Sequence, residues 1–335
     1  MNKKIKNILQ FILFISVGIL LFWLVYKDTD FKGLWQEVKN VNYYWFLLEL
    51  VLFILAHMSR AARWMMLIEP MNYKPRFWNT FYAVLVMYFV NLGLPRMGEV
   101  ARCGVVAQYD KVPVSKVLGT MVTERIFDLI MLFLITLAFI VFGGSLFSQF
   151  LANNPELSEN INKFFAPYIL IIVALFITMG LVVFYLIYKG KFNHIRFFNK
   201  VNRFFHNLTA GLMSFRGVKH KGMFIFHTVF IWFAYYIMIY ISFLAFNFTA
   251  ELSMMAALLV FVTSSYGMVA PAPNGMGAWH FMVIQSLILL GVVSTQAESF
   301  ALVVHSLQTA GIIVLGIFAF IALPIINRSD SAKIV

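Results

Sequence analysis

The sequence is poor in charged residues and in cysteine. Only 12% of its 335 residues are charged and 61% are hydrophobic, whereas soluble domains carry about 25% charged residues. A chain of this composition cannot cover a folded core with polar surface, so the bilayer is the expected solvent. The one cysteine, Cys103, excludes an intramolecular disulfide and a cysteine-rich metal site. Because no polar stretch reaches the length of a soluble catalytic domain, we expect one integral membrane domain over residues 1–335.

Acidic residues are scarce as well. The chain has 14 Asp and Glu against 26 Lys and Arg, a formal charge of +12. The positive residues are spread over short segments instead of forming one basic face, which favours anionic lipids over nucleic acid as partners. The sequence has no G-x-S-x-G, no phosphate-binding loop and no paired His and Glu at metal-binding spacing, and we interpret His57, His280 and His305 as scattered. We therefore expect neither enzyme activity nor a metal or cofactor.

Long apolar runs are what the sequence has in abundance. A helix needs about 20 apolar residues to cross a hydrocarbon core about 30 Å thick. Runs of this kind cover residues 8–26, 44–67, 117–142, 167–188, 224–248 and 300–326. Two further runs are broken: 81–104 by Gly93, Pro95 and Gly98, and 252–293 by Pro271, Pro273, Gly275 and Gly277. The predicted fold is an all-α polytopic membrane protein with about six full transmembrane helices and two re-entrant hairpins.

The distribution of Lys and Arg predicts the topology, because these residues are retained in the cytoplasm near the ends of spans. With the N-terminus inside and each broken run returning to its starting side, most Lys and Arg outside the spans are cytoplasmic. The exceptions are Lys27, Lys32, Lys39 and Lys163. We thus expect an inner-membrane protein with both termini in the cytoplasm. One hairpin then enters from each face, as in transporters with inverted repeats, and the breaks share a faint likeness, Pro95-Arg-Met-Gly98 and Pro273-Asn-Gly-Met-Gly277.

Residues 189–223 form a basic loop. Apolar residues recur in it at helical spacing, while Arg196, Lys200 and Arg203 fall elsewhere on the same helix. The pattern predicts an amphipathic cytoplasmic helix that lies on anionic headgroups.

Charged residues at membrane depth cost at least about 2.5 kcal/mol each, so they should be paired and face the interior or an aqueous cavity. They gather in two stretches, which contain Asn91, Arg96, Glu99 and Arg102, and then Glu124, Arg125 and Asp128. In the first stretch the i,i+3 spacing allows Glu99 to pair with Arg102. The break at Pro95 and Gly98 exposes backbone N–H groups that attract anions. A substrate site and a buried structural ion network both fit this pattern.

Arg60-x-x-Arg63 is open to two interpretations. Two guanidinium groups one turn apart suit a phosphodiester. The same pair near a span end is typical of a positive-inside anchor, with Trp64 in the aromatic belt. Charge counting leaves Arg60 and Arg63 in surplus, since the other three arginines at membrane depth balance the three carboxylates: Arg96, Arg102 and Arg125 against Glu99, Glu124 and Asp128.

The second break, residues 271–277, cannot form a regular helix. Irregular backbone in a membrane is tolerated only where protein or a water-filled cavity satisfies it. This makes Asn274 and the nearby His280 further candidates for substrate contact, although a packing kink would also explain the break.

These residues together resemble a known family, the transmembrane domain of lysylphosphatidylglycerol synthases, which also occurs in standalone flippase-like membrane proteins. The resemblance covers nearly the whole chain and rests on Arg60-x-x-Arg63-Trp64, residues 91–102, Glu124-Arg125 with Asp128, and residues 271–277. In two-domain members the membrane part is linked to lipid translocation and a separate soluble domain carries out aminoacylation. This sequence has no counterpart of the soluble domain, so the resemblance implies flippase-like transport. One departure is His280, where the family tends to have an acidic residue.

The expected function is that of a lipid flippase, moving a phospholipid or a lipid-linked polar headgroup across the inner membrane. The alternatives are an intramembrane enzyme acting on a lipid-linked substrate and a secondary transporter of small polar solutes. The expected partners are membrane lipids with an anionic or lipid-linked headgroup. Two further kinds of partner are compatible with the sequence: a second copy of the chain in a homo-oligomer, and a separate lipid-modifying enzyme. Because no nucleotide-binding site is visible, transport would use an ion gradient or be passive.

Overall fold

The computed structural model of the chain describes residues 31–156, 206–270 and 272–328, together with the single positions 23, 159, 178 and 189. These residues form helices and turns, and no strand occurs among them. The predicted all-α class is therefore confirmed. Two of the predicted spans, 8–26 and 167–188, lie almost entirely outside the described residues.

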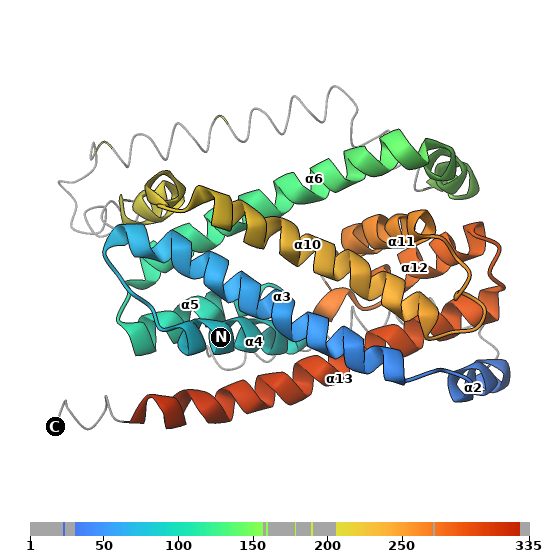
Figure 1. Cartoon of the computed structure of the whole chain (residues 1–335), viewed down its shortest axis with the longest axis horizontal. Coiled ribbons are helices and arrows are strands. Elements are labelled where there is room, and N and C mark those ends of the chain that lie inside the picture. Colours follow the sequence, from blue (N-terminus) through green and yellow to red (C-terminus); the bar gives the residue numbers. More distant parts are fainter. Residues whose placement is uncertain are drawn as a thin grey trace, which may run out of the picture.

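The other four predicted spans are confirmed as long apolar helices. They are α3 (Tyr44–Ile68), α6 (Val114–Asn153), α10 (Lys221–Leu244) and α13 (Ser294–Ile326). Each is long and apolar enough to cross a bilayer. The helices α3 and α10 run side by side in opposite directions through the middle of the molecule (Figure 1). The helix α6 bends at Gly143, where φ is −123° and ψ is 24°.

Both broken runs form helical hairpins. In the first, α4 (Phe77–Gly93) packs against α5 (Met97–Asp110), and in the second, α11 (Met254–Gly267) packs against α12 (Ala278–Leu289). These helices have 17, 14, 14 and 12 residues, which gives lengths of about 18 to 25 Å at 1.5 Å per residue. Each limb is shorter than a hydrocarbon core of about 30 Å, which supports the re-entrant interpretation.

The chain breaks where the prolines predict it. Pro95 has no N–H to donate, and Arg96 directly after it has a left-handed backbone with φ 63°. Asn274 likewise follows Pro273 and has φ 49°, within the short 3-10 helix η3 (Pro273–Gly275). Pro271 lies outside the described residues.

Close packing within the first hairpin requires Gly98. A Cβ atom at this position would overlap the carbonyl oxygen of Met87 and lie 2.7 Å from Asn91 Oδ1. The absence of a side chain thus lets the start of α5 lie against the end of α4.

The helices form two halves of opposite orientation. Each half has a long helix, a hairpin and a second long helix: α3, α4, α5 and α6, then α10, α11, α12 and α13. The two hairpins approach from opposite ends of the molecule (Figure 1). Corresponding helices begin at a nearly constant separation: Tyr44 and Lys221, Phe77 and Met254, Met97 and Ala278, and Val114 and Ser294. This is the inverted repeat that the sequence predicts.

Backbone conformation repeats along with the helices. Arg96 and Asn274 each directly follow a proline of their break and have a positive φ. Lys111 and Gly291, with φ 57° and 87°, each precede the first residue of the second long helix by three positions. A positive φ is uncommon outside glycine, so its recurrence at matching positions supports the repeat.

The two breaks contact each other. Arg96 Nη2 donates a hydrogen bond of 2.8 Å to the carbonyl of Val269, two residues after the end of α11. The helix α4 also contacts η3. The two hairpins therefore contact each other at the breaks where each hairpin reverses direction.

Short elements complete the described structure: α2 (Phe31–Lys39), which packs against α13, η1 (Glu69–Met71) and η2 (Ser214–Gly217). Most of the predicted amphipathic helix lies outside the described residues, but residues 206–212 are helical. There Gly211 lies against Gly119 of α6, and Thr123 Oγ1 donates to the carbonyl of Leu212 at 3.1 Å. The end of this segment thus packs on the protein itself.

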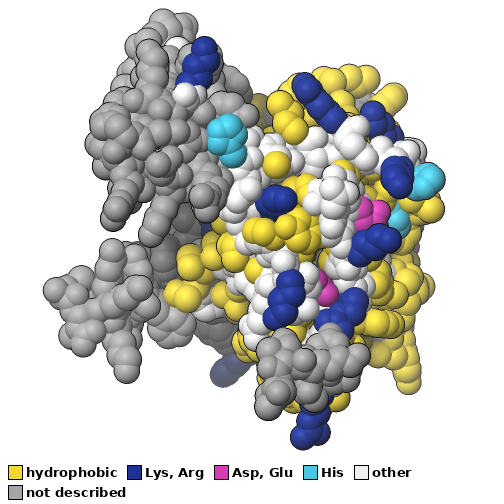
Figure 2. All heavy atoms as spheres, turned by 90° about the vertical axis from the view of Figure 1, so that its left-hand side faces the viewer, with side chains coloured by type: hydrophobic (Ala, Val, Ile, Leu, Met, Phe, Trp, Pro, Cys, Tyr) yellow, Lys and Arg dark blue, Asp and Glu magenta, His cyan; other side chains and the backbone are white. Residues whose placement is uncertain are grey.

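Basic side chains gather at one end of the molecule, which lies at the left in Figure 1 and faces the viewer in Figure 2. The exposed ones are Lys74, Arg76, Lys111, Arg216, Lys219, Lys221 and Arg328. We call this the basic end. At the opposite end, the described charged residues are mostly acidic: Glu37, Glu156, Glu251 and Glu298, with Lys32 and Lys39.

Candidate functional site

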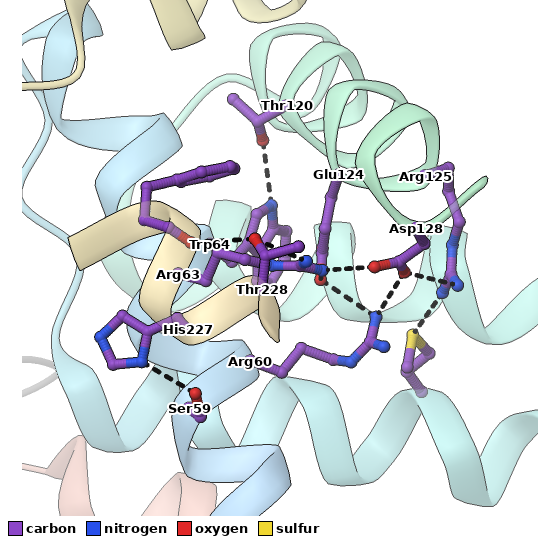
Figure 3. A network of polar contacts seen from close by, with 12 residues as sticks. Ser59, Arg60, Arg63, Trp64, Thr120, Glu124, Arg125, Asp128, His227 and Thr228 are labelled. Atoms are coloured by element: carbon purple, nitrogen blue, oxygen red, sulfur yellow. Dashed lines mark hydrogen bonds and ion pairs between the residues drawn. The ribbon is translucent and has the colours of Figure 1, made fainter. Parts of the chain in front are cut away.

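Most charged residues predicted at membrane depth come together in one place. We call this group the charge cluster; it consists of Arg60 and Arg63 from α3, Glu99 and Arg102 from α5, and Glu124, Arg125 and Asp128 from α6. Figure 3 shows the part formed by α3 and α6.

Two arginines and two carboxylates form the centre of the cluster. Arg60 Nη1 lies 3.0 Å from Glu124 Oε1 and 3.1 Å from Asp128 Oδ2. Arg63 Nη2 lies 2.9 Å from the same Glu124 oxygen and 2.8 Å from Asp128 Oδ1. The i,i+3 spacing on α3 and the i,i+4 spacing on α6 place each pair on one helix face. Both arginine side chains are at most 3% exposed, so the membrane-anchor interpretation is wrong: their charges are paired inside the protein.

Arg102 joins this centre from the first hairpin. Its Nη1 donates to Glu124 Oε2 at 2.7 Å, and its guanidinium lies 4.4 Å from the ring centre of Trp64. Trp64 is fully buried and donates to Thr120 Oγ1 at 3.0 Å, so it does not belong to an aromatic belt. The predicted pairing of Arg102 with Glu99 is also wrong, because Arg102 points from α5 to the carboxylate on α6.

Glu99 instead pairs with Arg125 at the edge of the cluster. Glu99 Oε1 lies 3.2 Å from Arg125 Nη2, and Arg125 Nη1 lies 3.4 Å from Asp128 Oδ2. Asn91 links this edge to the break: its Nδ2 donates to Glu99 at 3.5 Å and its Oδ1 accepts from the Gly98 N–H at 2.8 Å. With side chains 37% and 19% exposed, Arg125 and Glu99 are the accessible members of the cluster.

The charge count of the cluster differs from the prediction. Arg96 is exposed and bound to the second break, so it does not take part. With Arg60 and Arg63 included, four arginines face three carboxylates, which leaves one positive charge in excess. Several buried N–H groups of the cluster also have no acceptor: Nε of Arg60, Arg63, Arg102 and Arg125, and Nη2 of Arg102. Buried donors without an acceptor cost free energy. Because these donors belong to arginines that also carry the excess positive charge, an anion bound here would gain both hydrogen bonds and a favourable charge interaction.

The second break has its own polar contacts. The carbonyl of Asn274 accepts from His305 Nε2 at 3.0 Å, and Asn274 Nδ2 donates to Thr309 at 3.4 Å. The rings of His280 and His305 lie 4.4 Å apart. The interpretation of the histidines as scattered is therefore wrong for these two, which come from the neighbouring helices α12 and α13. It holds for His57, whose ring stacks on Phe53.

Sequence reasoning missed one buried acid, Glu49. Its carboxyl group accepts from Gln308 Nε2 at 2.8 Å and lies 3.0 Å from Ser242 Oγ. The signal was available, because a lone acidic residue inside an apolar run of this length is a candidate functional residue.

The fold and the cluster define a polytopic helical membrane protein with a buried, net positive site beside the meeting point of two re-entrant hairpins. The chain belongs to the family described as lysylphosphatidylglycerol synthase TM region, which matches residues 8–316. This confirms the resemblance and places the chain among membrane proteins with a lipid-related function. No curated protein and no solved structure matches the chain.

Proposed function

We propose that the protein is a flippase-like transporter that moves a lipid with an anionic headgroup across the membrane. The charge cluster carries this proposal, because it offers excess positive charge and unused guanidinium donors at membrane depth. A phosphate or carboxylate is the group that such donors bind best.

The position of the accessible edge favours a lipid over a soluble ligand. Arg125 stands on α6 about 17 Å from its first residue at 1.5 Å per residue, within the apolar part of this helix that is long enough to span a hydrocarbon core. Val122, Ile126 and Leu129 on the same flank of α6 are exposed apolar side chains and suit contact with acyl chains. A headgroup arriving from the side therefore meets Arg125 and Glu99 first.

Arg102 supplies the donors for tight binding. Its Nη1 is held by Glu124, while its Nε and Nη2 are buried without an acceptor. These two nitrogens form the side of the guanidinium that binds a phosphate with two parallel hydrogen bonds. Since Arg102 is fully buried, the headgroup reaches it only after the Glu99–Arg125 pair separates.

We also propose that the basic end faces the cytoplasm of an inner-membrane protein, with both chain termini on that side. The support is the concentration of exposed Lys and Arg at the basic end (Figure 2). The described charged residues at the opposite end are mostly acidic. The proposed activity is transport without covalent chemistry, so the protein is not an enzyme in this account.

Purified protein in liposomes provides the test. Fluorescent phospholipid analogues in the inner leaflet become accessible to a membrane-impermeant reductant only after translocation. Wild-type protein should move the anionic analogue faster than protein-free liposomes do, and Arg102→Gln should remove this acceleration. Arg102→Lys should recover little, because an ammonium group cannot form the two parallel bonds.

Arg216→Gln is the matched control, since it neutralises an exposed arginine at the basic end and should transport like wild type. Thermal stability in detergent shows that the variants are folded. A wild-type protein that moves a radiolabelled soluble metabolite but no lipid would replace this proposal with solute transport. A covalently altered lipid product would replace it with an intramembrane enzyme.

A further inference from the structure

A second polar cluster surrounds Glu49 of α3, whose hydrogen-bonding partners stand on α10 and α13 of the second half. Its side chain is buried, with 4% of the residue exposed. Its hydrogen-bonding neighbours, Gln308 and Ser242, are neutral, and no described residue forms an ion pair with it. A buried carboxylate without a counter-charge is unfavourable. Protonation removes that penalty without requiring any other group to move.

The contacts of Ser242 fit two protonation states. Its Oγ lies 3.0 Å from Glu49 Oε2 and 2.9 Å from the carbonyl oxygen of Met238. A hydroxyl has one proton to donate, so it cannot donate to both oxygens at once. When Glu49 is ionised, Ser242 donates to Oε2. When Oε2 carries a proton, it donates to Ser242 Oγ, and the hydroxyl donates to Met238.

The inverted repeat relates this cluster to the charge cluster. Counted from the first residue of their helices, His280 matches Glu99, His305 matches Arg125, and Gln308 matches Asp128. The contact between His280 and His305 thus stands where Glu99 pairs with Arg125 in the first half. The second half therefore has two histidines and a glutamine where the first half has the Glu99–Arg125 ion pair and Asp128.

Other titratable side chains stand on the elements around Glu49. They are Tyr235 and Tyr240 on α10, Tyr88 on α4, His305 on α13, His57 on α3, and Lys32, Glu37 and Lys39 on α2, which packs against α13. Among the described residues none of them forms a hydrogen bond or ion pair with Glu49. A change in the charge of Glu49 is thus not compensated by a direct partner.

Contacts along α13 connect Glu49 to the second break. Gln308 stands one turn from His305, whose Nε2 donates to the carbonyl of Asn274. His280 in turn accepts from the N–H of Gly277 at 3.3 Å through Nδ1. A shift of α13 at Gln308 therefore reaches the break that Arg96 joins to the first hairpin.

We propose that Glu49 is a proton-binding site and that its protonation drives or gates lipid movement. The proton adds to Oε2 and leaves from the same oxygen, so only an O–H bond forms and breaks. Binding of the proton is independent of the substrate, whereas the coupling part rests on the proposed lipid transport.

Infrared difference spectroscopy of the purified protein between acidic and alkaline pH tests the proton site. Wild type should show a C=O stretching band of a protonated carboxyl group that Glu49→Gln lacks. Glu251→Gln, which changes an exposed acid at the same end of the molecule, should keep it. Ser242→Ala should shift the band, because it removes the partner of Oε2. A band unchanged in Glu49→Gln overturns the proposal; if that variant does not fold, an unshifted band in Ser242→Ala overturns it.

Liposomes with and without a pH gradient test the coupling. A gradient of one unit is a tenfold difference in proton concentration, about 1.4 kcal/mol. It should change the rate of lipid movement by wild type and by Glu251→Gln but not by Glu49→Gln. A wild-type rate of lipid movement that is the same with and without the gradient overturns the proposed coupling. A wild type that moves no lipid refutes the proposed function instead, and the infrared band still decides the proton site.

Discussion

Neutralising Glu124 should destabilise the protein strongly, because this carboxylate holds three arginines at once. Its two oxygens lie 2.7 to 3.0 Å from nitrogens of Arg60, Arg63 and Arg102, and the residue is fully buried. Glu124→Gln keeps the side-chain volume but leaves these charges with Asp128 as their remaining central counter-ion. Removing one partner from a buried ion pair costs about 3–5 kcal/mol. At roughly 2–4 °C per kcal/mol, the apparent melting temperature should fall by roughly 6–20 °C.

A second substitution should recover part of this loss. Arg102→Gln combined with Glu124→Gln restores the original excess of one positive charge, and it removes the arginine that has Glu124 as its hydrogen-bonding partner. Residues in direct contact show coupling energies of about 0.5–3 kcal/mol. The double variant should therefore be more stable than the sum of the two single changes predicts.

Gel filtration of detergent-solubilised protein after heating measures the melting temperatures, with Glu251→Gln as the exposed control. An unchanged melting temperature in Glu124→Gln would show that the cluster does not hold α3, α5 and α6 together. Strict additivity of Arg102→Gln and Glu124→Gln would show that the 2.7 Å contact carries no coupling.

Packing and topology give two further predictions. Gly98→Ala should lower stability by about 1–3 kcal/mol, because the added methyl group overlaps the α4 backbone; Gly104→Ala in the same helix has open space at that position and should melt like wild type. In intact cells that express a variant without Cys103, a cysteine at the exposed Asn153 should react with an impermeant thiol reagent, and one at the exposed Lys219 should react only after permeabilisation. The reverse labelling pattern would contradict a cytoplasmic basic end.

The sequence predicted the architecture well because its signals are local. The length of the apolar runs predicted the four spans that the structure describes, and Pro95 and Pro273 predicted the positions of the breaks. The faint likeness of the two breaks corresponds to an inverted repeat of helices, in which Arg96 and Asn274 both have a left-handed backbone after a proline. Helix length, proline and periodicity act within one segment, so they can be read without knowing which helices pack together.

The partners within the site could not be predicted from spacing. An i,i+3 rule pairs Glu99 with Arg102, but Arg102 lies 2.7 Å from Glu124 on another helix. Arg60 and Arg63, near the end of a span, were open to two interpretations, an interfacial anchor and a phosphodiester site, because their carboxylate partners stand on another helix, α6. Glu49 and Gln308 are likewise joined only by packing between α3 and α13. Such contacts depend on helix rotation, which the sequence of one segment does not specify.

The most direct test of the account is headgroup selectivity in liposomes. The ratio of translocation rates for an anionic and a zwitterionic phospholipid with identical acyl chains isolates the contribution of the headgroup. The account predicts a ratio above one for wild type, and a ratio near one for Arg102→Gln that remains folded in detergent. Equal rates for the two lipids in wild type, or a preference retained by folded Arg102→Gln, would contradict the assignment of the charge cluster as the anion site.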